Sequence, residues 1–411
     1  MRLISLGLAL CAAAAAASPE YHARREALAK AEPNGIIVLF GAGEAEGDEL
    51  RSRFYQEPNF YYLTGWKQPG AILLIDPKRE VLFLPTHNLD REKWTGPEAG
   101  PDDPKVRDLT GCDTVLPAAR FESELRVSLE QRQKIYTVGD EAKARLRALA
   151  PLRPLGDAEA TLARMRMRKS PREIDLLQRA ADATVAAHLA AWKKAAPGMF
   201  EYQVAATLVS VYMDLGCERS AYPPIVGSGP DSVYLHYQRN ERRMDRGDLL
   251  LMDAGGECAG YTADVTRTIP VGGKFTKRQR EIYEIVLGAQ KAAINAVKPG
   301  VAIGTRAAGS LYQIAYDYID SHGKDVHGDS LGKYFTHGIS HQIGLEVHDA
   351  AEPGAALAEG MVISVEPGIY IPEENIGIRI EDMVLVTQDG ARVLTAALPR
   401  EAADIEKALL R

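Results

Sequence analysis

The first third of the chain alternates short apolar runs with amphipathic stretches. Continuous apolar runs bounded by Gly, Pro or charged residues predict four buried strands, at 35–40, 71–75, 80–84 and 134–138. Helical periodicity predicts three helices, at 21–31, 121–133 and 140–149. Because strands and helices alternate, we expect a small α/β domain over residues 19–150.

The pattern changes after residue 150. Two prolines in the segment 151–154 interrupt the periodicity and predict a linker over 151–169. Ser170, Pro171 and Glu173 then match a helix start, with a capping serine, a proline in the first turn and a glutamate that completes a capping box. The rest of the chain alternates helices with strands punctuated by glycine, which predicts a second domain over 170–411.

The N-terminal residues have the pattern of a secretory signal. Arg2 precedes an apolar stretch at 3–10, and small alanines follow at 12–17, which predicts a signal peptide over residues 1–17 and export to the periplasm or the cell exterior. The alternative is a membrane anchor, but the apolar run of about 15 residues is shorter than the roughly 20 that span a bilayer. A lipid anchor on Cys11 fits less well, because Leu10 is larger than the residue usual at that position. No later stretch is long and apolar enough to predict stable membrane insertion.

Composition adds exclusions. A chain of 411 residues is too long for one ordinary core, and its 46% hydrophobic and 26% charged residues are normal for a globular protein. The net charge of −7 argues against a partner with a phosphate backbone, so no nucleic acid is expected. The four cysteines, at 11, 112, 217 and 258, show no CxxC and no Cys/His spacing. We therefore predict neither a disulfide framework nor a thiolate metal site, and expect the cysteines of the mature chain to be small buried residues.

Candidate chemistry lies in five segments of the second domain. Asp253 ends the apolar run 249–252, where a carboxylate is costly to bury unless it meets a cation. Asp264, Thr266 and Thr268 share one face of what the alternation predicts to be the returning strand of a hairpin. Asp253 and Asp264 are then expected to face each other, and a shared metal would remove their repulsion.

The third and fourth segments add imidazoles and a third acid. His337, His341 and His348 fall within twelve residues, although the whole chain has nine histidines. Glu366 ends an apolar strand at 362–366 that Pro367 and Gly368 terminate. Taken singly, each of these segments also fits an ordinary structural role, such as a turn cap or a solvent-facing acid.

The fifth segment completes the set. Arg379 and Glu381 are two positions apart, so on a strand they point to one face, while Ile378 and Ile380 point into packing. Together the segments supply four carboxylates and one to three imidazoles on or beside apolar strands. An oxygen-rich set of this kind suits two hard divalent ions, with Mn²⁺ the natural candidate and Zn²⁺ or Co²⁺ as alternatives.

The five segments resemble the signature of the pita-bread metallopeptidases, the family of aminopeptidase P, prolidase and methionine aminopeptidase. The resemblance implies a C-terminal pita-bread (creatinase/aminopeptidase) catalytic domain. It places the five metal-ligand positions on Asp253, Asp264, His341, Glu366 and Glu381. In that pattern Asp264 and Glu381 bridge both ions, Asp253 binds one ion, and His341 and Glu366 bind the other.

Other segments resemble the prolyl branch of the family. His337 and His348 flank His341 as they do in that branch, and a loop with His236 resembles the one that brings a histidine to the proline pocket. The segments that resemble the small creatinase-like N-terminal α/β domain of aminopeptidase P are 53–65 and 94–97. The resemblance therefore implies hydrolysis of the N-terminal Xaa-Pro bond in peptides whose second residue is proline.

The family mechanism implies a role for each site residue. A hydroxide between two metal ions would attack the scissile carbonyl, and Glu366 would move the proton to the leaving nitrogen. His348 and His337 would stabilise the developing charge, and His236 and Arg379 would line the site. The alternatives are an Xaa-Pro dipeptidase with the same five ligands, and a binding protein of this fold, which would typically lack several of them. Family members often form homodimers or homotetramers, and no segment of the sequence decides between these states.

Overall fold

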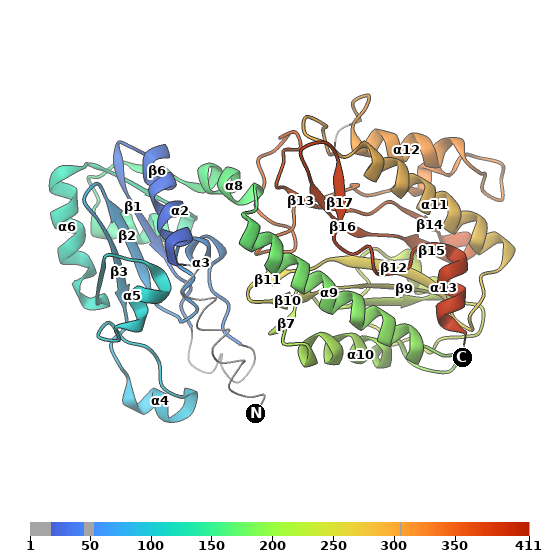
Figure 1. The fold of residues 1–411 in the computed structure, drawn as a ribbon, viewed down its shortest axis with the longest axis horizontal. Coiled ribbons are helices and arrows are strands. Elements are labelled where there is room, and N and C mark those ends of the chain that lie inside the picture. Colours follow the sequence, from blue (N-terminus) through green and yellow to red (C-terminus); the bar gives the residue numbers. More distant parts are fainter. Residues whose placement is uncertain (1–17, 45–52, 305, 411) are drawn as a thin grey trace. The chain divides into compact units, whose positions relative to one another are not determined.

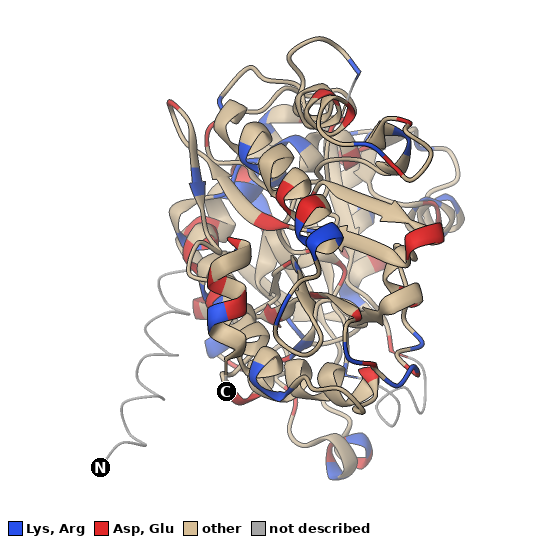
Figure 2. Cartoon of the chain, turned by 90° about the vertical axis from the view of Figure 1, so that its right-hand side faces the viewer, with Lys and Arg blue, Asp and Glu red and all other residues tan. Residues whose placement is uncertain are grey.

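The computed structural model describes residues 18–44, 53–304 and 306–410, so the predicted signal peptide and Cys11 lie outside the described residues. The chain forms two compact units that divide between Met165 and Arg166 (Figure 1). Within the described ranges, no helix combines the length and the apolar character that crossing a membrane requires. In the view of Figure 2, acidic and basic residues are interspersed along the helices and loops, and neither sign gathers in one region.

The first unit is built on a mixed sheet with helices packed around it (Figure 1). The strand order is β4-β3-β2-β1-β5-β6, with β1 antiparallel to β2 and parallel to β5. The strands are β1 (Gly35–Phe40), β2 (Ile72–Asp76), β3 (Arg79–Leu84), β4 (Thr114–Pro117), β5 (Lys134–Thr137) and β6 (Leu155–Asp157). The helices are α2 (Ser18–Ala31), α3 (Pro58–Thr64), α4 (Leu89–Thr95), α5 (Lys105–Thr110), α6 (Phe121–Gln131), α7 (Asp140–Leu149) and α8 (Glu159–Met167).

A buried arginine of α2 joins several of these elements. The Arg25 guanidinium donates to the carboxylate of Glu80 on β3 and to the carbonyls of Leu63, Thr110 and Gly111. A fully buried charge is stable only when it is paired and hydrogen-bonded, as this one is. Arg25 therefore fixes α2 against the ends of α3 and α5.

The predicted linker is not extended chain. Residues 151–169 contain β6, which pairs with β5 at the edge of the first sheet, and most of α8. β6 has only three residues, too few to show a hydrophobic pattern. Two prolines directly before it predict a break in regular structure, so the strand is not predicted from the sequence. The units divide within α8, between Met165 and Arg166, which lies inside the predicted linker.

The second unit contains four small antiparallel sheets, with helices packed against their strands (Figure 1). The sheets are β11-β10-β7, β12-β9-β8, β13-β16-β17 and β14-β15. The strands are β7 (Arg219–Ser220), β8 (Ile225–Ser228), β9 (Leu249–Ala254), β10 (Gly256–Cys258), β11 (Tyr261–Thr262), β12 (Val265–Pro270), β13 (Val362–Val365), β14 (Gly368–Ile371), β15 (Ile376–Arg379), β16 (Asp382–Val386) and β17 (Ala391–Val393). The helices are α9 (Pro171–Lys194), α10 (Glu201–Asp214), α11 (Lys277–Ala296), α12 (Leu311–Ser321) and α13 (Ala402–Leu409).

Helix α9 begins as the sequence predicts. Ser170 accepts from the Glu173 amide, and the Glu173 carboxylate accepts from the Ser170 amide, so the capping box is complete. One face of α9 is apolar and packs against β10, β11 and β12. The helix thus supports the strands that lead to Asp253 and Asp264.

The prediction that the cysteines form no disulfide is wrong for one pair. Cys217, after α10, and Cys258, at the end of β10, are joined by a disulfide, with their Cα atoms 4.1 Å apart. They are 41 residues apart in the sequence, so their approach depends on the pairing of β7 with β10, which no local pattern reveals. Cys112 in the first unit is a free buried thiol, as expected.

Candidate active site

Two adjacent strands position the first pair of carboxylates. In β9, Asp253 lies opposite Thr266 of β12 and not opposite Asp264, which precedes the ladder by one residue. The expectation that the two aspartates face each other directly is therefore wrong. Since Asp264 and Thr266 share a face, Asp264 lies diagonally beside Asp253. The Tyr222 hydroxyl joins the two carboxylates, lying 2.5 Å from Oδ1 of each.

The other two carboxylates lie where strands break. Glu366 falls between β13 and β14, and Glu381 between β15 and β16. The Glu381 amide donates to the carbonyl of Thr266, and the Thr266 hydroxyl donates to Oε2 of Glu381 over 2.7 Å. Ile378 and Ile380 are fully buried, as the alternation predicts. Thr266 of β12 therefore holds the segment between β15 and β16 that carries Glu381.

His341 lies between carboxylates from both groups of strands. Its Nε2 is 3.3 Å from Oδ2 of Asp264 and 3.4 Å from Oε1 of Glu366. Its Nδ1 lies 3.1 Å from the carbonyl of Gln342, and its amide donates to the hydroxyl of Ser364 on β13. The contact of Nδ1 with that carbonyl leaves Nε2 facing the two carboxylates, where it carries a proton in the metal-free protein and would offer its lone pair to a metal.

Every residue that the sequence predicts for the site lines one cavity of about 300 Å³. The nine are His236, Asp253, Asp264, His337, His341, His348, Glu366, Arg379 and Glu381. The ring centroids of His341 and His348 are 4.2 Å apart. Among the described residues, His236 and His348 have no hydrogen bond to the protein, so their ring nitrogens are open to a ligand in the cavity.

Burial and mutual repulsion raise the proton affinity of three carboxylates. Burial raises the pKa of Glu366 to about 7. Burial, followed by the charges of Asp264 and Glu366, raises the pKa of Glu381 well above its ordinary value. Burial also raises the pKa of Asp253, against the opposing effect of Arg379. Without a further cation, this cluster resists full ionisation.

The imidazoles divide into two kinds. Burial alone would lower the pKa of His341, but the hydrogen bond and charge of Asp264 raise it to about 9. The same contact outweighs burial at Asp264 and keeps the pKa of that carboxyl below its ordinary value. Burial and the Arg379 charge lower the pKa of His337 to about 4, and burial also lowers the pKa of His348. His337 and His348 are therefore neutral near pH 7.

This donor set fits divalent cations. Single ligand atoms of Asp264, His341 and Glu381 all lie within 4.8 Å of one another. Oε1 of Glu381 is buried and has no hydrogen-bond partner in the described part of the chain. A buried carboxylate oxygen without a donor is rare and costly, and a bound cation removes that cost. Oxygen donors with one imidazole suit a hard ion better than a soft one.

The sequence matches the models of two known protein families. Residues 175–388 match the model of metallopeptidase family M24. The chain belongs to metallopeptidase family M24. Within that family, residues 21–136 of this member also match the N-terminal domain of aminopeptidase P. The family implies divalent metal ions, in agreement with the donor set, and the predicted pita-bread fold of the second unit is confirmed.

Relatives within family M24 extend over nearly the whole chain. A Xaa-Pro aminopeptidase of Haemophilus influenzae is 35% identical, in a match over 94% of this chain and 96% of the relative. The structure of aminopeptidase P from E. coli with the inhibitor Pro-Leu superposes with a TM-score of 0.86 at 32% identity, covering 95% of this chain and 98% of that one. Proline aminopeptidase P II from Yersinia pestis superposes with a TM-score of 0.84 at 33% identity, covering 95% and 99%.

Three polar residues of this M24 site had no predicted role. Tyr222 contacts both aspartates, and Thr266 contacts Glu381 and Arg379. Tyr370 lies between Arg379 and His337, with its hydroxyl 2.9 Å from a nitrogen of each. Tyr222 lies two residues after the end of β7 and has no local hydrophobic or spacing signal. Only the tertiary pairing of strands brings it to the carboxylates.

Proposed function

We propose that this protein is a metal-dependent aminopeptidase that hydrolyses the N-terminal Xaa-Pro bond of peptides. The observation that supports the proposal most strongly is that the nine predicted site residues line one cavity. The match of the first unit to the N-terminal domain of aminopeptidase P supports the choice of substrate. An Xaa-Pro dipeptidase would use the same carboxylates, so substrate length is what separates the two activities.

Asp253, Asp264, His341, Glu366 and Glu381 would hold two divalent ions, which we propose to be Mn²⁺, with Zn²⁺ or Co²⁺ as alternatives. Four carboxylates balance the charge of two such ions, and the orphaned oxygen of Glu381 gains a partner. When bound, the ions would lower the pKa of a water molecule and so supply a nucleophile at neutral pH.

Glu366 is placed to move the proton of the reaction. Its carboxylate lines the cavity beside His341, where it would accept a proton from the attacking water and pass it to the leaving nitrogen. The neutral His348 would donate a hydrogen bond to the developing oxyanion. His337, whose ring nitrogens contact the Gly338 carbonyl and the Tyr370 hydroxyl, would line the proline side of the bond. The Tyr370 hydroxyl, 2.9 Å from Nε2 of His337, holds that ring in place.

The carboxylate of Asp253 gives the cavity its preference for a free amino terminus. The Asp253 carboxylate is paired with the Arg379 guanidinium, which fixes its direction. An α-ammonium group entering the cavity would be attracted to this carboxylate end. His236 also lines the cavity and would contact the proline ring, whose nitrogen has no N–H to donate in the peptide bond.

A metal-reconstitution assay tests the proposal. The metal-free protein is titrated with Mn²⁺, Zn²⁺ or Co²⁺, and hydrolysis of an Xaa-Pro-Xaa-Xaa peptide is followed beside the matched Xaa-Ala-Xaa-Xaa peptide. We expect activity to rise to about two equivalents of metal and to require proline. Activity that is independent of metal, or equal on both peptides, would contradict the proposal.

We also propose that the protein is exported. The signal pattern of residues 1–17 supports export, and so does the Cys217–Cys258 disulfide, because disulfides persist mainly in oxidising compartments. Fractionation of the producing cells and N-terminal sequencing of the purified protein test this. Export predicts a mature protein that begins near Ser18, and an intact Met1 in the cytoplasmic fraction would refute it.

A further inference from the structure

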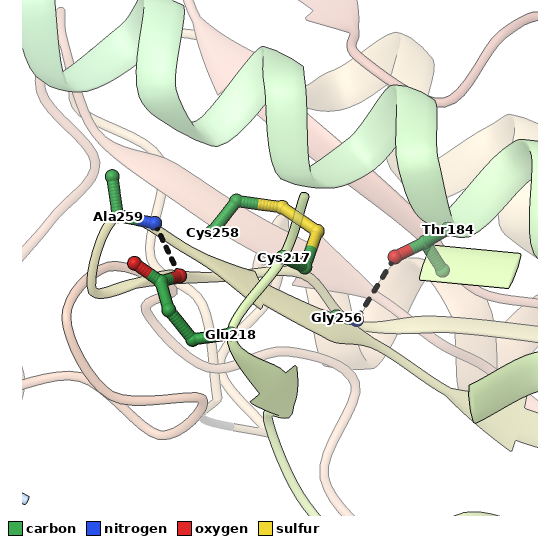
Figure 3. The surroundings of a disulfide bond; sticks show 6 residues. All are labelled: Thr184, Cys217, Glu218, Gly256, Cys258 and Ala259. Carbon is green, nitrogen blue, oxygen red and sulfur yellow. Dashed lines mark hydrogen bonds between the residues drawn. A yellow bond between two sulfur atoms is a disulfide. The ribbon is translucent and has the colours of Figure 1, made fainter. Parts of the chain in front are cut away.

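The disulfide lies beside the strands that bear the aspartates. Both cysteines are buried, with 5% of Cys217 and 0% of Cys258 exposed. Figure 3 shows the bond beside α9, with β10 leading away from it. β10 begins at Gly256, three residues after Asp253.

A continuous backbone ladder links the disulfide to the carboxylates. The Glu218 amide donates to the carbonyl of Glu257, β7 pairs with β10, and the Ala221 amide donates to the carbonyl of Gly255. The next residue is Tyr222, whose hydroxyl contacts Asp253 and Asp264. The cross-link thus closes one end of a ladder whose other end is the metal-binding pair.

The turn after Cys258 is held by the same segment. Ala259 has φ of 55°, a left-handed conformation that is unfavourable for a residue with a side chain. The Glu218 carboxylate accepts from the Ala259 amide over 2.7 Å, and Thr184 of α9 accepts from the Gly256 amide over 3.0 Å (Figure 3). The cross-link keeps Glu218 within reach of this turn.

Close packing makes the hairpin sensitive to displacement. A Cβ added at Gly255 would lie 1.8 Å from the carbonyl oxygen of Ala263, so the two backbones are in direct contact. Asp253 and Asp264 lie two residues and one residue from this contact. Thr262 is in turn hydrogen-bonded to the carbonyl of Gly344, on the loop between His341 and His348. Movement of the hairpin would therefore reach both the aspartates and the histidine loop.

We propose that Cys217 and Cys258 form a structural disulfide whose role is to hold Asp253, Asp264 and Tyr222 in the metal-binding arrangement. The proposal rests on the proposed metal site. Formation takes two electrons and two protons from the two thiols and passes them to a disulfide oxidant, such as an oxidised dithiol protein of the export compartment, which leaves as a dithiol. The same protein made under reducing conditions would then bind metal more weakly.

The bond itself is tested on the mature protein after export, which retains Cys112, Cys217 and Cys258. Free thiols are alkylated under denaturing, non-reducing conditions, and the digest is mapped by mass spectrometry. We expect a peptide pair joined through Cys217 and Cys258, with Cys112 alkylated. Quantitative alkylation of all three cysteines would overturn the proposal, whatever the protein's activity.

The effect on metal is tested by variants. Cys217→Ala/Cys258→Ala is compared with Cys112→Ala, a buried cysteine of the first unit that forms no disulfide. Metal-loaded proteins are exposed to a chelator, and bound Mn²⁺ is measured with time. We expect the double variant to lose metal at least about tenfold faster than the wild type. For a cross-link of 41 residues we also expect its unfolded fraction to rise by roughly 30- to 900-fold, whereas Cys112→Ala keeps the wild-type rate of metal loss.

If the double variant does not fold, wild-type protein from oxidising and reducing expression hosts gives the same comparison. Equal metal retention by the cross-linked and reduced proteins would overturn the proposal. A wild type that is cross-linked but binds no metal in any form would instead refute the proposed function, so the two failures are distinguishable.

Discussion

At the scale of single residues, proton affinity in the cavity depends on partners more than on residue type. Asp264 and Glu381 are both buried carboxylates, yet their pKa values move in opposite directions. His341 lies 3.3 Å from Asp264 and compensates its burial, whereas Oε1 of Glu381 has no partner in the described chain. Asp264 is therefore ionised near pH 7 without a metal, whereas ionisation of Glu381 requires a nearby cation.

Glu366→Gln separates proton transfer from metal binding. The amide can still offer a carbonyl oxygen to a metal but cannot accept a proton, so we expect partial metal content and a fall in kcat of about 10²- to 10⁴-fold. Metal analysis and steady-state kinetics on the same preparation measure both. Glu359→Gln, on the exposed chain before β13, is the matched control and should behave as the wild type. A Glu366→Gln variant with full turnover would exclude the proton-transfer role.

His348→Ala tests a residue that meets only the substrate. Its ring lines the cavity beside His341, but it is not among the five proposed ligands. We expect metal content to stay within error of the wild type while kcat falls by roughly 10- to 10³-fold, because a hydrogen bond to the developing charge is lost. The kcat and the bound metal are measured on the same preparation. An unchanged kcat would show that His348 takes no part in the reaction.

At the scale of elements, a buried charge network anchors the histidine loop to the start of the second unit. Asp349, which follows His348, pairs with Arg166 and with Lys169, whose Nζ is 3.0 Å from Oδ2. Burial would raise the pKa of Asp349, but the Lys169 and Arg166 charges outweigh it and hold the pKa below its ordinary value of 3.8. The anionic form is therefore the one that stabilises the fold.

Asp349→Asn should lower the free energy of unfolding by about 3–5 kcal/mol near pH 7, because the buried Lys169 loses its counter-ion and Arg166 loses one of its carboxylate partners. The pKa of Asp349 is lowered on folding, so its stabilisation is complete above the unfolded value of 3.8 and is lost as pH falls through the lower folded value. Urea unfolding at several pH values should show a constant gap to the wild type that narrows only below about pH 4. Asp389→Asn, on an exposed turn, is the control, and a gap that widens on acidification would contradict this account.

At the scale of the whole molecule, local signals in the sequence predict local structure well. The strand at 35–40, the helix at 140–149 and the capping box at Ser170 are found at the predicted residues. The acids Asp253, Glu366 and Glu381 stand out in the sequence because a carboxylate on or beside an apolar strand is unusual. The choice of His236 and the grouping of all nine residues into one site rest instead on the resemblance to the metallopeptidase family. The Cys217–Cys258 pair, the contact of Tyr222 with the aspartates and the pairing of Asp253 with Thr266 could not be predicted, because each depends on the register of strands distant in sequence.

The short elements were missed for a related reason. α3, α4 and α5 have six or seven residues each, fewer than two full turns of useful periodicity. The starts of α3 and α4 depend on side-chain caps, such as the Glu57 carboxylate that accepts from the Asn59 and Phe60 amides. A cap of this kind can be assigned only when the backbone conformation before the helix is known.

The most direct test of the central claim is the length of the substrate that the metal-loaded protein cleaves. An Xaa-Pro-Xaa-Xaa peptide and the corresponding Xaa-Pro dipeptide are digested side by side, and the products are identified by mass spectrometry. We predict one free amino acid and a tripeptide that begins with proline, with kcat/KM at least as high for the tetrapeptide, because contacts beyond proline that strengthen in the transition state raise it. An intact tetrapeptide beside a rapidly cleaved dipeptide would contradict the account and indicate a dipeptidase.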